Sequence, residues 1–289
     1  MNVHTSHTMQ RIGRPLVAGL ARRVTGSRRE IKDLPEWAGF GNQLFFYLWA
    51  AARRWSGHEV SLVRGPRSES WFEHFPALRD LTIGRSEVRW DDVRDRTSWE
   101  VISEAGIGDP HRWELVGRFI DEYLLSSHQF IPRVDLVEGV TLNVRRGDYF
   151  SDPSVRGRFG FDQLAYTEVV LDRLRSEERP PGVIRVVSDD LEWCRARLGR
   201  IVLVDEQLTF PETSGPTGDL EVVAGSRELI IMNSSFSIWA AYISNRLHGD
   251  NHRLVHVPAF GTRPFHGSPW PSIDPRWDVV ESIPGGWDS

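Results

Sequence analysis

The feature that most constrains this chain is the repeated alternation of short apolar segments with helical segments in its second half. Apolar runs that favour strands lie at residues 140–144, 183–187, 201–204, 229–232 and 254–257. Helices are predicted at residues 161–176, 191–198, 219–226 and 238–244, and a loop at residues 150–160. Strands that alternate with helices in this way predict an α/β fold with a parallel sheet covered on both faces.

A glycine loop precedes a helix in the first half of the chain. Gly39 and Gly41 stand before an unbroken apolar and alanine-rich run at residues 44–55, which predicts a helix, and residues 60–63 predict a strand. Loops of this kind let backbone N–H groups approach an anion at a helix N-terminus. The full G-x-G-x-x-G fingerprint of dinucleotide-binding folds is absent. Residues 66–130 show no strong periodicity.

Two adjacent arginines, Arg145 and Arg146, follow the predicted strand at residues 140–144. The guanidinium group is a planar fork of donors that matches the oxygens of a phosphate. Strand alternation places Arg145 on the same face as Asn143 and turns Arg146 to the other face. We therefore expect one arginine to face a ligand and the other to brace the loop through Asp148. An ordinary surface ion pair is the alternative interpretation.

Three predicted strand ends carry polar side chains that suit a nucleoside diphosphate. They are the arginine pair, the carboxylates of Asp189 and Asp190, and the hydroxyls of Ser234, Ser235 and Ser237. Ligands of open α/β sheets bind at the carboxyl ends of the strands. The helix after Ser237 would point its N-terminus at phosphate. The alternatives are that one aspartate only caps the next helix and that the serines are an ordinary N-cap cluster.

Composition narrows the range of partners and cofactors. The net charge is −5 and the pI is about 6.1, so a nucleic-acid partner is not predicted. The single cysteine, Cys194, excludes an intrachain disulfide and a cysteine-based zinc site. No His-x-x-x-His pair lies within a predicted helix, as the zinc type requires, so no metal site is predicted. No apolar run reaches the length of a membrane-spanning helix, and a cytoplasmic location is expected.

The N-terminal extension, residues 1–30, is basic. The 35 basic side chains of the protein are 34 arginines and one lysine, and several arginines between residues 11 and 29 surround a predicted amphipathic helix at 15–25. One interpretation is peripheral contact with an anionic membrane, at its inner face. The other, which we favour, is a helix packed on its own domain. Deleting residues 1–30 should weaken association with anionic vesicles in the first case, whereas a truncated protein that fails to fold would show that the helix belongs to the core.

Four segments together resemble the inverting α-1,2-fucosyltransferase family of bacteria and eukaryotes. They are Ala38–Tyr47, Asn143–Tyr149, Ser188–Asp190 with Trp193, and Asp219–Glu221 followed by Asn233–Ala241. Each segment is a weak signal by itself. All four occur in the order of the family, and together they span roughly Gly39 to Ala241.

The resemblance implies a GT-B-like fold, in which two Rossmann-like domains face each other across a cleft. After the extension at residues 1–30, residues 31–138 would form the acceptor-side domain and residues 139–289 would bind GDP-L-fucose. The implied reaction moves L-fucose from GDP-β-L-fucose to a hydroxyl of a glycan or lipid-linked oligosaccharide. It proceeds with inversion, as an α-1,2 transfer to galactose. No cofactor and no metal ion are implied.

The resemblance also implies roles for individual residues. Arg145 would hold the β-phosphate and stabilise the departing GDP, and Asp189 would accept hydrogen bonds from guanine. Asp148 is the second candidate for catalysis, although no general base is identified. The further candidates for donor binding are Gly41, Asn42, Asn143, Arg146, Asp190, Ser235, Phe236 and Ser237.

The chain departs from the family pattern at several places. Asn143 replaces a histidine, Ile238 replaces the first tryptophan of a pair, and Ala38 replaces a glycine. The strand expected before the glycine loop is interrupted at residues 33–36. Two alternatives therefore stand beside a fucosyltransferase. One is a related transferase with another linkage or nucleotide sugar, and the other is a catalytically silent paralogue that binds nucleotide sugars.

The twelve tryptophans suggest stacking on sugars, although buried aromatic side chains more often form core. The three on predicted helices, Trp49, Trp193 and Trp239, are expected in the core. The candidates for an acceptor site are Trp71, Trp90, Trp99 and Trp113.

Overall fold

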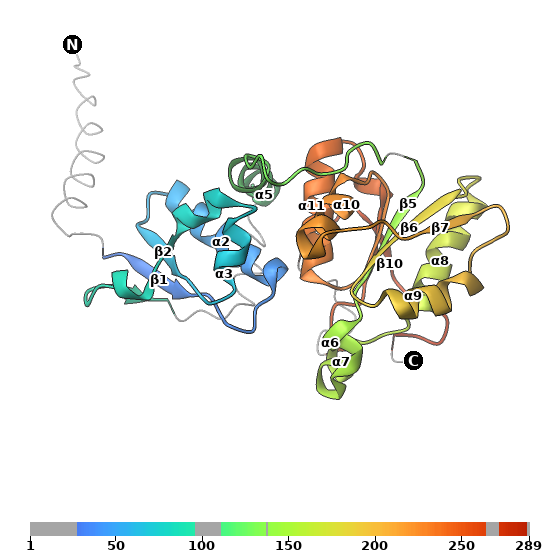
Figure 1. Ribbon diagram of the computed structural model, residues 1–289, viewed down its shortest axis with the longest axis horizontal. Helices are drawn as coiled ribbons and strands as arrows, with labels where there is room; N and C mark the ends of the chain where they lie inside the picture. Colours follow the sequence, from blue (N-terminus) through green and yellow to red (C-terminus); the bar gives the residue numbers. More distant parts are fainter. Residues whose placement is uncertain (1–27, 96–110, 137, 264–271, 288–289) are drawn as a thin grey trace, which may run out of the picture.

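The computed structural model describes residues 28–95, 111–136, 138–263 and 272–287 (Figure 1). The predicted helix at residues 15–25 lies outside these ranges. The described chain contains two parallel sheets, placed side by side with helices between them. We name the part with the first sheet the N-terminal domain and the part with the second sheet the C-terminal domain. The predicted α/β fold with two Rossmann-like domains is confirmed.

The N-terminal domain is built on a four-stranded parallel sheet in the order β3-β2-β1-β4. Its strands are β1 (Glu30–Asp33), β2 (Val60–Val63), β3 (Thr82–Ile83) and β4 (Val93–Arg94). The helical elements are α2 (Phe40–Trp55), α3 (Ser68–Phe72), η1 (Pro76–Leu81), η2 (Arg85–Glu87), α5 (Arg112–Phe119) and the π-helical turn η3 (Ile120–Leu124). Helix α2 connects the parallel neighbours β1 and β2, as a crossover must.

The prediction that the strand before the glycine loop is interrupted is wrong. Strand β1 ends at Asp33, two residues before Pro35, and pairs with both β2 and β4. The strand is obscured in the sequence because it is short and its third residue is the chain's one lysine. Lys32 is buried, where its ammonium group bonds Asp95 and lies 5.4 Å from the ring centre of Trp49. These contacts allow a charge inside the strand.

The C-terminal domain is built on a six-stranded parallel sheet in the order β10-β9-β8-β5-β6-β7. Its strands are β5 (Val140–Val144), β6 (Val183–Ser188), β7 (Gln207–Thr209), β8 (Leu229–Ile231), β9 (Val255–Pro258) and β10 (Asp278–Val280). Its helical elements are α6 (Gly147–Ser151), α7 (Pro153–Phe159), α8 (Gln163–Ser176), α9 (Leu191–Arg197), η4 (Leu198–Arg200), α10 (Gly215–Gly225), α11 (Ser235–His248) and η5 (His252–Leu254). The strands that follow β5 in the chain, β6 and β7, lie on one side of it, whereas the strands that follow its neighbour β8, β9 and β10, lie on the other side. A ligand crevice is expected at such a switch point.

The predicted loop at residues 150–160 is wrong. Helices α6 and α7 occupy this segment and project as a separate lobe (Figure 1). The Asp152 side chain caps α7 by accepting hydrogen bonds from the backbone N–H groups of Ser154 and Val155, and Pro153 occupies the first turn. These residue types also favour turns, so the sequence pattern alone predicts a loop here.

The predicted strand at residues 201–204 is also wrong. Leu203 and Val204 are exposed in a turn, and strand β7 begins only at Gln207. The turn is held by Glu206, whose carboxylate accepts hydrogen bonds from the Leu203 N–H and from Arg175. Strand β10 was not predicted, because three residues carry too little pattern.

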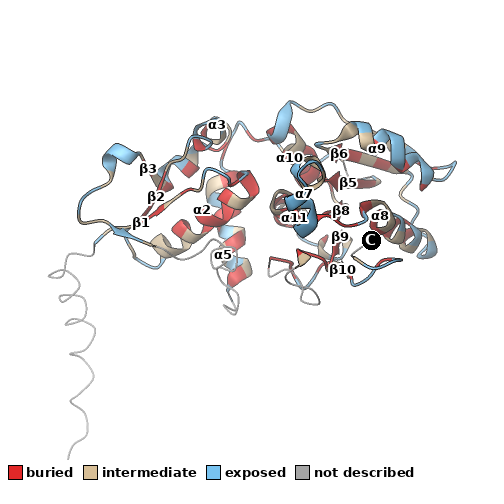
Figure 2. Ribbon diagram, turned by 90° about the horizontal axis from the view of Figure 1, so that it is seen from below, coloured by how far each residue is buried: buried red, intermediate tan, exposed pale blue. Residues whose placement is uncertain are grey.

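A single apolar cluster joins the two domains. Helices α2 and α5 meet α11 through aromatic side chains, with Phe45 5.2 Å and Phe119 5.5 Å from Trp239 between ring centres. Helix α2 is buried over most of its length (Figure 2), and residues 237–245 of α11 are all buried. Trp239 is fully buried, and Trp49 and Trp193 are partly buried against apolar clusters, as predicted.

A buried charge network lies on the C-terminal sheet away from its carboxyl edge. His256 on β9 bonds Asp278 at 2.7 Å and Glu228 at 3.2 Å. Burial acts to lower the pKa of His256, but the two carboxylates outweigh it and the net shift is upward. The hydrogen bond from His256 is the main cause of a lowered pKa at Asp278.

These shifts predict a window of maximal stability. The contribution of His256 is fully present below its unfolded pKa of about 6.5 and is lost as pH rises through the raised folded value. The contribution of Asp278 is present above about pH 4 and is lost as pH falls through its lowered folded pKa. We expect His256→Gln to flatten the decline in unfolding free energy as pH rises above about 6.5, measured by urea titration. An unchanged pH profile would contradict this.

Candidate functional site

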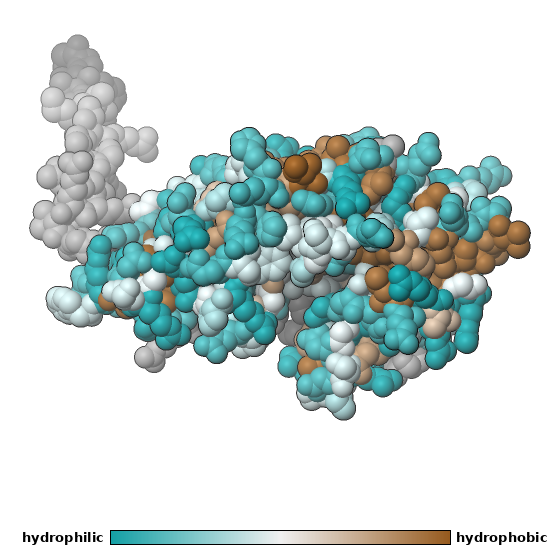
Figure 3. Space-filling view, viewed as in Figure 1, coloured by the Kyte–Doolittle hydropathy of each residue, from teal (hydrophilic) through white to brown (hydrophobic). Residues whose placement is uncertain are grey.

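The carboxyl edges of the two sheets enclose a cleft of about 690 Å³. The space-filling view is notched between the N-terminal domain and the lobe of α6 and α7 (Figure 3). The cleft is lined from the C-terminal domain by residues of three strand ends, after β5, β6 and β8. The predicted site residues that line it are Gly41, Asn42, Asn143, Arg145, Asp148, Asp189, Ser235 and Phe236. Arg146, Asp190 and Ser237 do not line it.

Arg145 lies at the switch point, directly after β5. Its two terminal nitrogens donate to Asp189 and to Asp148, each at 2.6 Å. These two bonds use two of the five N–H donors of the guanidinium group. The side chain stays 38% exposed and lines the cleft. Arg145 is therefore oriented by two carboxylates and still has donors for a ligand.

Arg146 turns to the other face, as the strand argument predicts. Its guanidinium group stacks 3.8 Å from the ring centre of Phe150 and 4.0 Å from that of Trp193. Only 13% of its side chain is exposed, and burial is the main cause of its lowered pKa. It bonds Asp190 at 3.1 Å. The prediction that Arg146 braces the loop through Asp148 is thus wrong, because Asp148 pairs with Arg145.

The two aspartates after β6 have different tasks. Asp190 caps α9 by accepting a hydrogen bond from the Trp193 N–H at 3.0 Å, as expected of one of the pair. Asp189 accepts from Arg145 with one oxygen and from the Arg146 backbone N–H with the other, at 2.7 Å. Each of its oxygens therefore already accepts one hydrogen bond within the protein.

Asn143 and Ser237 form a buried pair beneath the cleft. The Ser237 hydroxyl donates to Oδ1 of Asn143 at 2.6 Å, and Nδ2 of Asn143 donates to the Val187 carbonyl. Both side chains are almost fully buried. Ser237 is consequently a packing residue that links α11 to β5, and its predicted contact with the donor through its hydroxyl is not supported.

The N-termini of α2 and α11 converge on the cleft. Gly41 touches the backbone of α11 so closely that a Cβ placed there would lie 2.5 Å from the carbonyl carbon of Ser235 and 2.8 Å from Cα of Phe236. The N-cap residue of α11, Ser234, makes no capping bond with its side chain. The first N–H groups of this 14-residue helix are thus directed at the cleft, where they can bind an anion.

Asp219 is a residue of the cleft that the sequence patterns do not single out as a site residue. It lies on α10, lines the cleft, and accepts a hydrogen bond from the Thr213 hydroxyl at 2.6 Å. Burial raises the pKa of Asp219, opposed by the Thr213 hydrogen bond and reinforced by the charge of Asp189. The signal was present in the sequence as the Asp219–Glu221 segment, but only the fold brings it beside Arg145 and Asp189.

The wall contributed by the N-terminal domain is mainly aromatic. Trp71 stacks on Phe40 with ring centres 3.7 Å apart and planes 15° apart, and Trp37 is 56% exposed beside them. Of the other predicted acceptor candidates, Trp90 is almost fully exposed but does not line the cleft, and Trp113 lines a different cavity. Trp99 lies outside the described residues.

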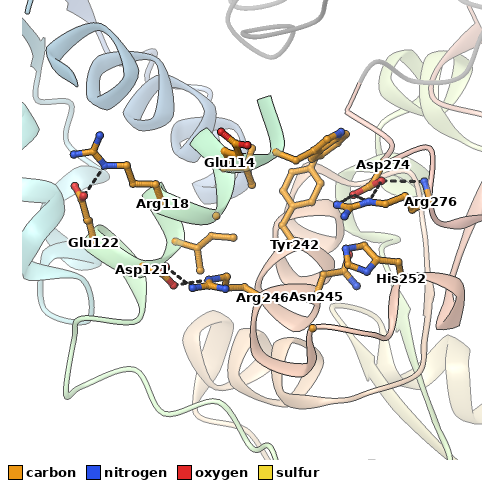
Figure 4. Close-up of a pocket in the computed structure, with 15 residues that line it drawn as sticks. Glu114, Arg118, Asp121, Glu122, Tyr242, Asn245, Arg246, His252, Asp274 and Arg276 are labelled. Carbon is orange, nitrogen blue, oxygen red and sulfur yellow. Dashed lines mark hydrogen bonds and ion pairs between the residues drawn. The ribbon is translucent and has the colours of Figure 1, made fainter. Parts of the chain in front are cut away.

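That second cavity, of about 500 Å³, lies between α5, η3 and the C-terminal half of α11 (Figure 4). Its charged groups pair with one another: Arg246 bonds Asp121 twice, at 2.7 Å, and Arg276 bonds Asp274. Arg118 donates to Glu122 in the same way. Because these pairs satisfy the charges that line it, the cavity offers weaker anchoring for an anion than the cleft.

Neither a metal-binding cluster nor a membrane-spanning helix occurs among the described residues. No group of three or more His, Cys, Asp or Glu side chains in them is arranged to hold a metal ion. Within the same ranges, none of the helices combines the length and the apolar character needed to cross a bilayer.

Residues 133–250 match the model of a family described as glycosyl transferase family 11. The chain is 30% identical over 128 residues to an alpha-1,2-colitosyltransferase of Escherichia coli, covering 42% of this chain and 41% of the relative. It is 32% identical over 144 residues to the galactoside 2-alpha-L-fucosyltransferase Sec1 of Mus musculus, covering 48% and 37%. The chain thus spans less than half the length of these relatives.

Solved structures are similar only at a distance. A glycosyl transferase family 9 protein from Veillonella parvula overlaps with a TM-score of 0.44 at 11% identity, over 88% of this chain and 86% of the other. The alpha-1,6-fucosyltransferase NodZ, soaked with GDP-fucose, overlaps with a TM-score of 0.33 at 13% identity, over 75% and 92%. The fold is therefore assigned from the chain's own sheet topology. Residues 133–250, which carry the arginine pair and the α11 motif, are thus similar to glycosyl transferase family 11.

Proposed function

We propose that this protein is an inverting glycosyltransferase that moves L-fucose from GDP-β-L-fucose to a sugar hydroxyl, with an α-1,2 linkage to galactose. The observation that carries the proposal is Arg145, which lies at the β5–β8 switch point beside the N-terminus of α11. A diphosphate placed there meets a guanidinium fork and a set of backbone N–H groups. The names of the E. coli and mouse relatives support transfer of an L-sugar to the 2-position.

In this proposal Arg145 acts on the leaving group. Negative charge grows on the β-phosphate as the bond to the sugar breaks, and donors already aimed at that oxygen lower the barrier. Asp148 and Asp189 fix the guanidinium plane before the donor arrives. Asp148 is thus a positioning residue for Arg145. Because protein donors handle the developing charge, we propose that transfer needs no metal ion, and chelation with EDTA should leave its rate unchanged.

We propose that Asp219, rather than Asp189, recognises the base. A carboxylate can accept hydrogen bonds from both N1–H and the 2-amino group of guanine, whereas adenine lacks the 2-amino group. Asp189 has both oxygens engaged. Asp219 lines the same cleft and is bonded by a single hydroxyl. Its raised pKa indicates a desolvated carboxylate, which gains more from donors supplied by a ligand.

The donor is tested by thermal shift. GDP and GDP-fucose should raise the melting temperature, because a ligand that binds only the native state stabilises it by about 2.7 kcal/mol at a hundred times its Kd. UDP and ADP should not. We expect Asp219→Asn to weaken GDP binding by about tenfold or more, since one guanine donor then faces an amide. Glu212→Gln is the matched control, because Glu212 is exposed nearby and does not line the cleft. Equal shifts with UDP would rule out the proposed donor.

A second donor is favoured by one comparison. The E. coli relative is described as a colitosyltransferase, and colitose is L-fucose that lacks the 3-hydroxyl. Transfer rates with GDP-fucose and GDP-colitose would separate the two candidates.

A further inference from the structure

The N-terminal wall of the cleft carries one charge. Among the described residues that line this wall, Arg67 is the charged side chain, and the others are aromatic, glycine or asparagine. Arg67 is exposed, and none of the ion pairs within the described chain involves it. The neighbouring arginines differ, since Arg64 pairs with Glu69 and Glu87, and Arg79 pairs with Glu69. Arg67 thus presents an uncompensated positive charge to the cleft.

Sheet topology fixes the place of this charge. Trp37 follows β1 and Arg67 follows β2, and these strands are parallel neighbours, so both loops leave the same edge of the sheet. The stack of Phe40 on Trp71 holds the two loops together. The aromatic faces and the guanidinium group therefore form one surface, opposite the wall that carries Arg145.

The two walls differ in what they can bind. The C-terminal wall offers Arg145, Arg158 and the α11 N–H groups, which suit the diphosphate of the donor. Its carboxylates, Asp148, Asp189 and Asp219, disfavour a second anion there. On the opposite wall, an anion on the other substrate can pair with Arg67. Aromatic rings beside it can cover the apolar face of a sugar, as protein aromatic groups do in carbohydrate sites.

We infer that the acceptor is an acidic saccharide, in which an anionic group on the residue next to the accepting galactose pairs with Arg67. The anionic group is a carboxylate or a sulfate. This inference rests on the proposed function for the galactose, but it concerns the acceptor wall alone. It therefore predicts a preference among acceptors that has no effect on donor binding.

The experiment measures acceptor binding to the full-length, GDP-loaded protein. The probes are Galβ1–4GlcA and its carboxyl-reduced form, lactose, which differ only in the charged group; 6-sulfated lactose distinguishes sulfate from carboxylate. We expect an acidic disaccharide to bind about three- to tenfold more tightly than lactose, with the ratio falling at high salt. Arg67→Gln should bring the ratio to about one and leave lactose affinity unchanged.

Arg85→Gln is the matched control, because Arg85 is exposed on the same domain and does not line the cleft. It should retain the preference. The inference is overturned if wild type binds neither acidic disaccharide more tightly than lactose, or if Arg67→Gln keeps the preference. The GDP thermal shift separates this failure from failure of the proposed function. A protein that binds GDP but ignores acceptor charge loses only the inference.

Discussion

Arg145→Lys is expected to lower kcat at saturating GDP-fucose by a factor on the order of 10² or more, the cost typical of losing one transition-state donor. Lysine keeps the positive charge but cannot form the planar fork. The planar shape matters because the guanidinium group of Arg145 bonds both Asp148 and Asp189 and also faces the cleft. The ammonium group of the lysine, on its flexible side chain, would pair with one of the two carboxylates and move away from the phosphate.

Arg146→Lys is the matched comparison, since the same change is made one residue along. Arg146 lies between the rings of Phe150 and Trp193 and does not line the cleft. We expect this variant to lose stability, by about 1–2 kcal/mol from weakened stacking, and to retain most of its activity once folded. Transfer rates and melting temperatures, measured for both variants, test which arginine faces the cleft. A folded Arg146→Lys protein that is less active than Arg145→Lys would contradict the face assignment, and near-native rates in both would remove Arg145 from the mechanism.

The parts of the fold that sequence patterns predicted are those in which burial is continuous. Strand β5 is buried at all five positions and β8 at all three, so their apolar runs were unambiguous. The missed parts are held by contacts rather than by pattern. Strand β1 contains a buried lysine, whose ammonium group bonds Asp95, the residue after β4. Helix α7 begins at residues that equally favour a turn. Such cases depend on partners that a local window does not contain.

The candidate site divides in the same way. Strand periodicity alone separated the faces of Arg145 and Arg146, because alternation is a local property. The carboxylate partners of Arg145 could not be assigned from sequence spacing. Asp189 bonds Arg145 although it lies 44 residues further along the chain, and Asp148 bonds Arg145 at the same time. The proposed role of Asp219 as a guanine acceptor is not predictable from the sequence, because it depends on the groups to which Asp189 is already bonded. Hydrogen-bond competition of this kind requires the three-dimensional arrangement.

Among additions of a single methyl group at the cleft, we expect Gly41→Ala to lower stability and activity the most. Gly41 lies in the first turn of α2, and its Cα faces the backbone of α11 at Ser235 and Phe236. A backbone segment cannot move aside as a flexible side chain can, so the two helices must separate. They join the domains through the shared apolar cluster, and their N-termini form the floor of the cleft. Separation would therefore cost packing and would also shift the donors that face the phosphate.

The expected loss is about 1–3 kcal/mol of unfolding free energy, the usual range for an overpacked core, although alanine is intrinsically the better helix former by about 1 kcal/mol. A shift of about 1 Å at the site can lower the rate by about 10², so kcat should fall as well. Gly39→Ala is the control. Gly39 has φ −67°, which any residue adopts, and nothing lies within 4 Å of a Cβ placed there. Urea unfolding and transfer rates would be measured for both. If Gly41→Ala matched Gly39→Ala in stability and rate, the close approach of α2 to α11 would not be what sets the geometry of the cleft.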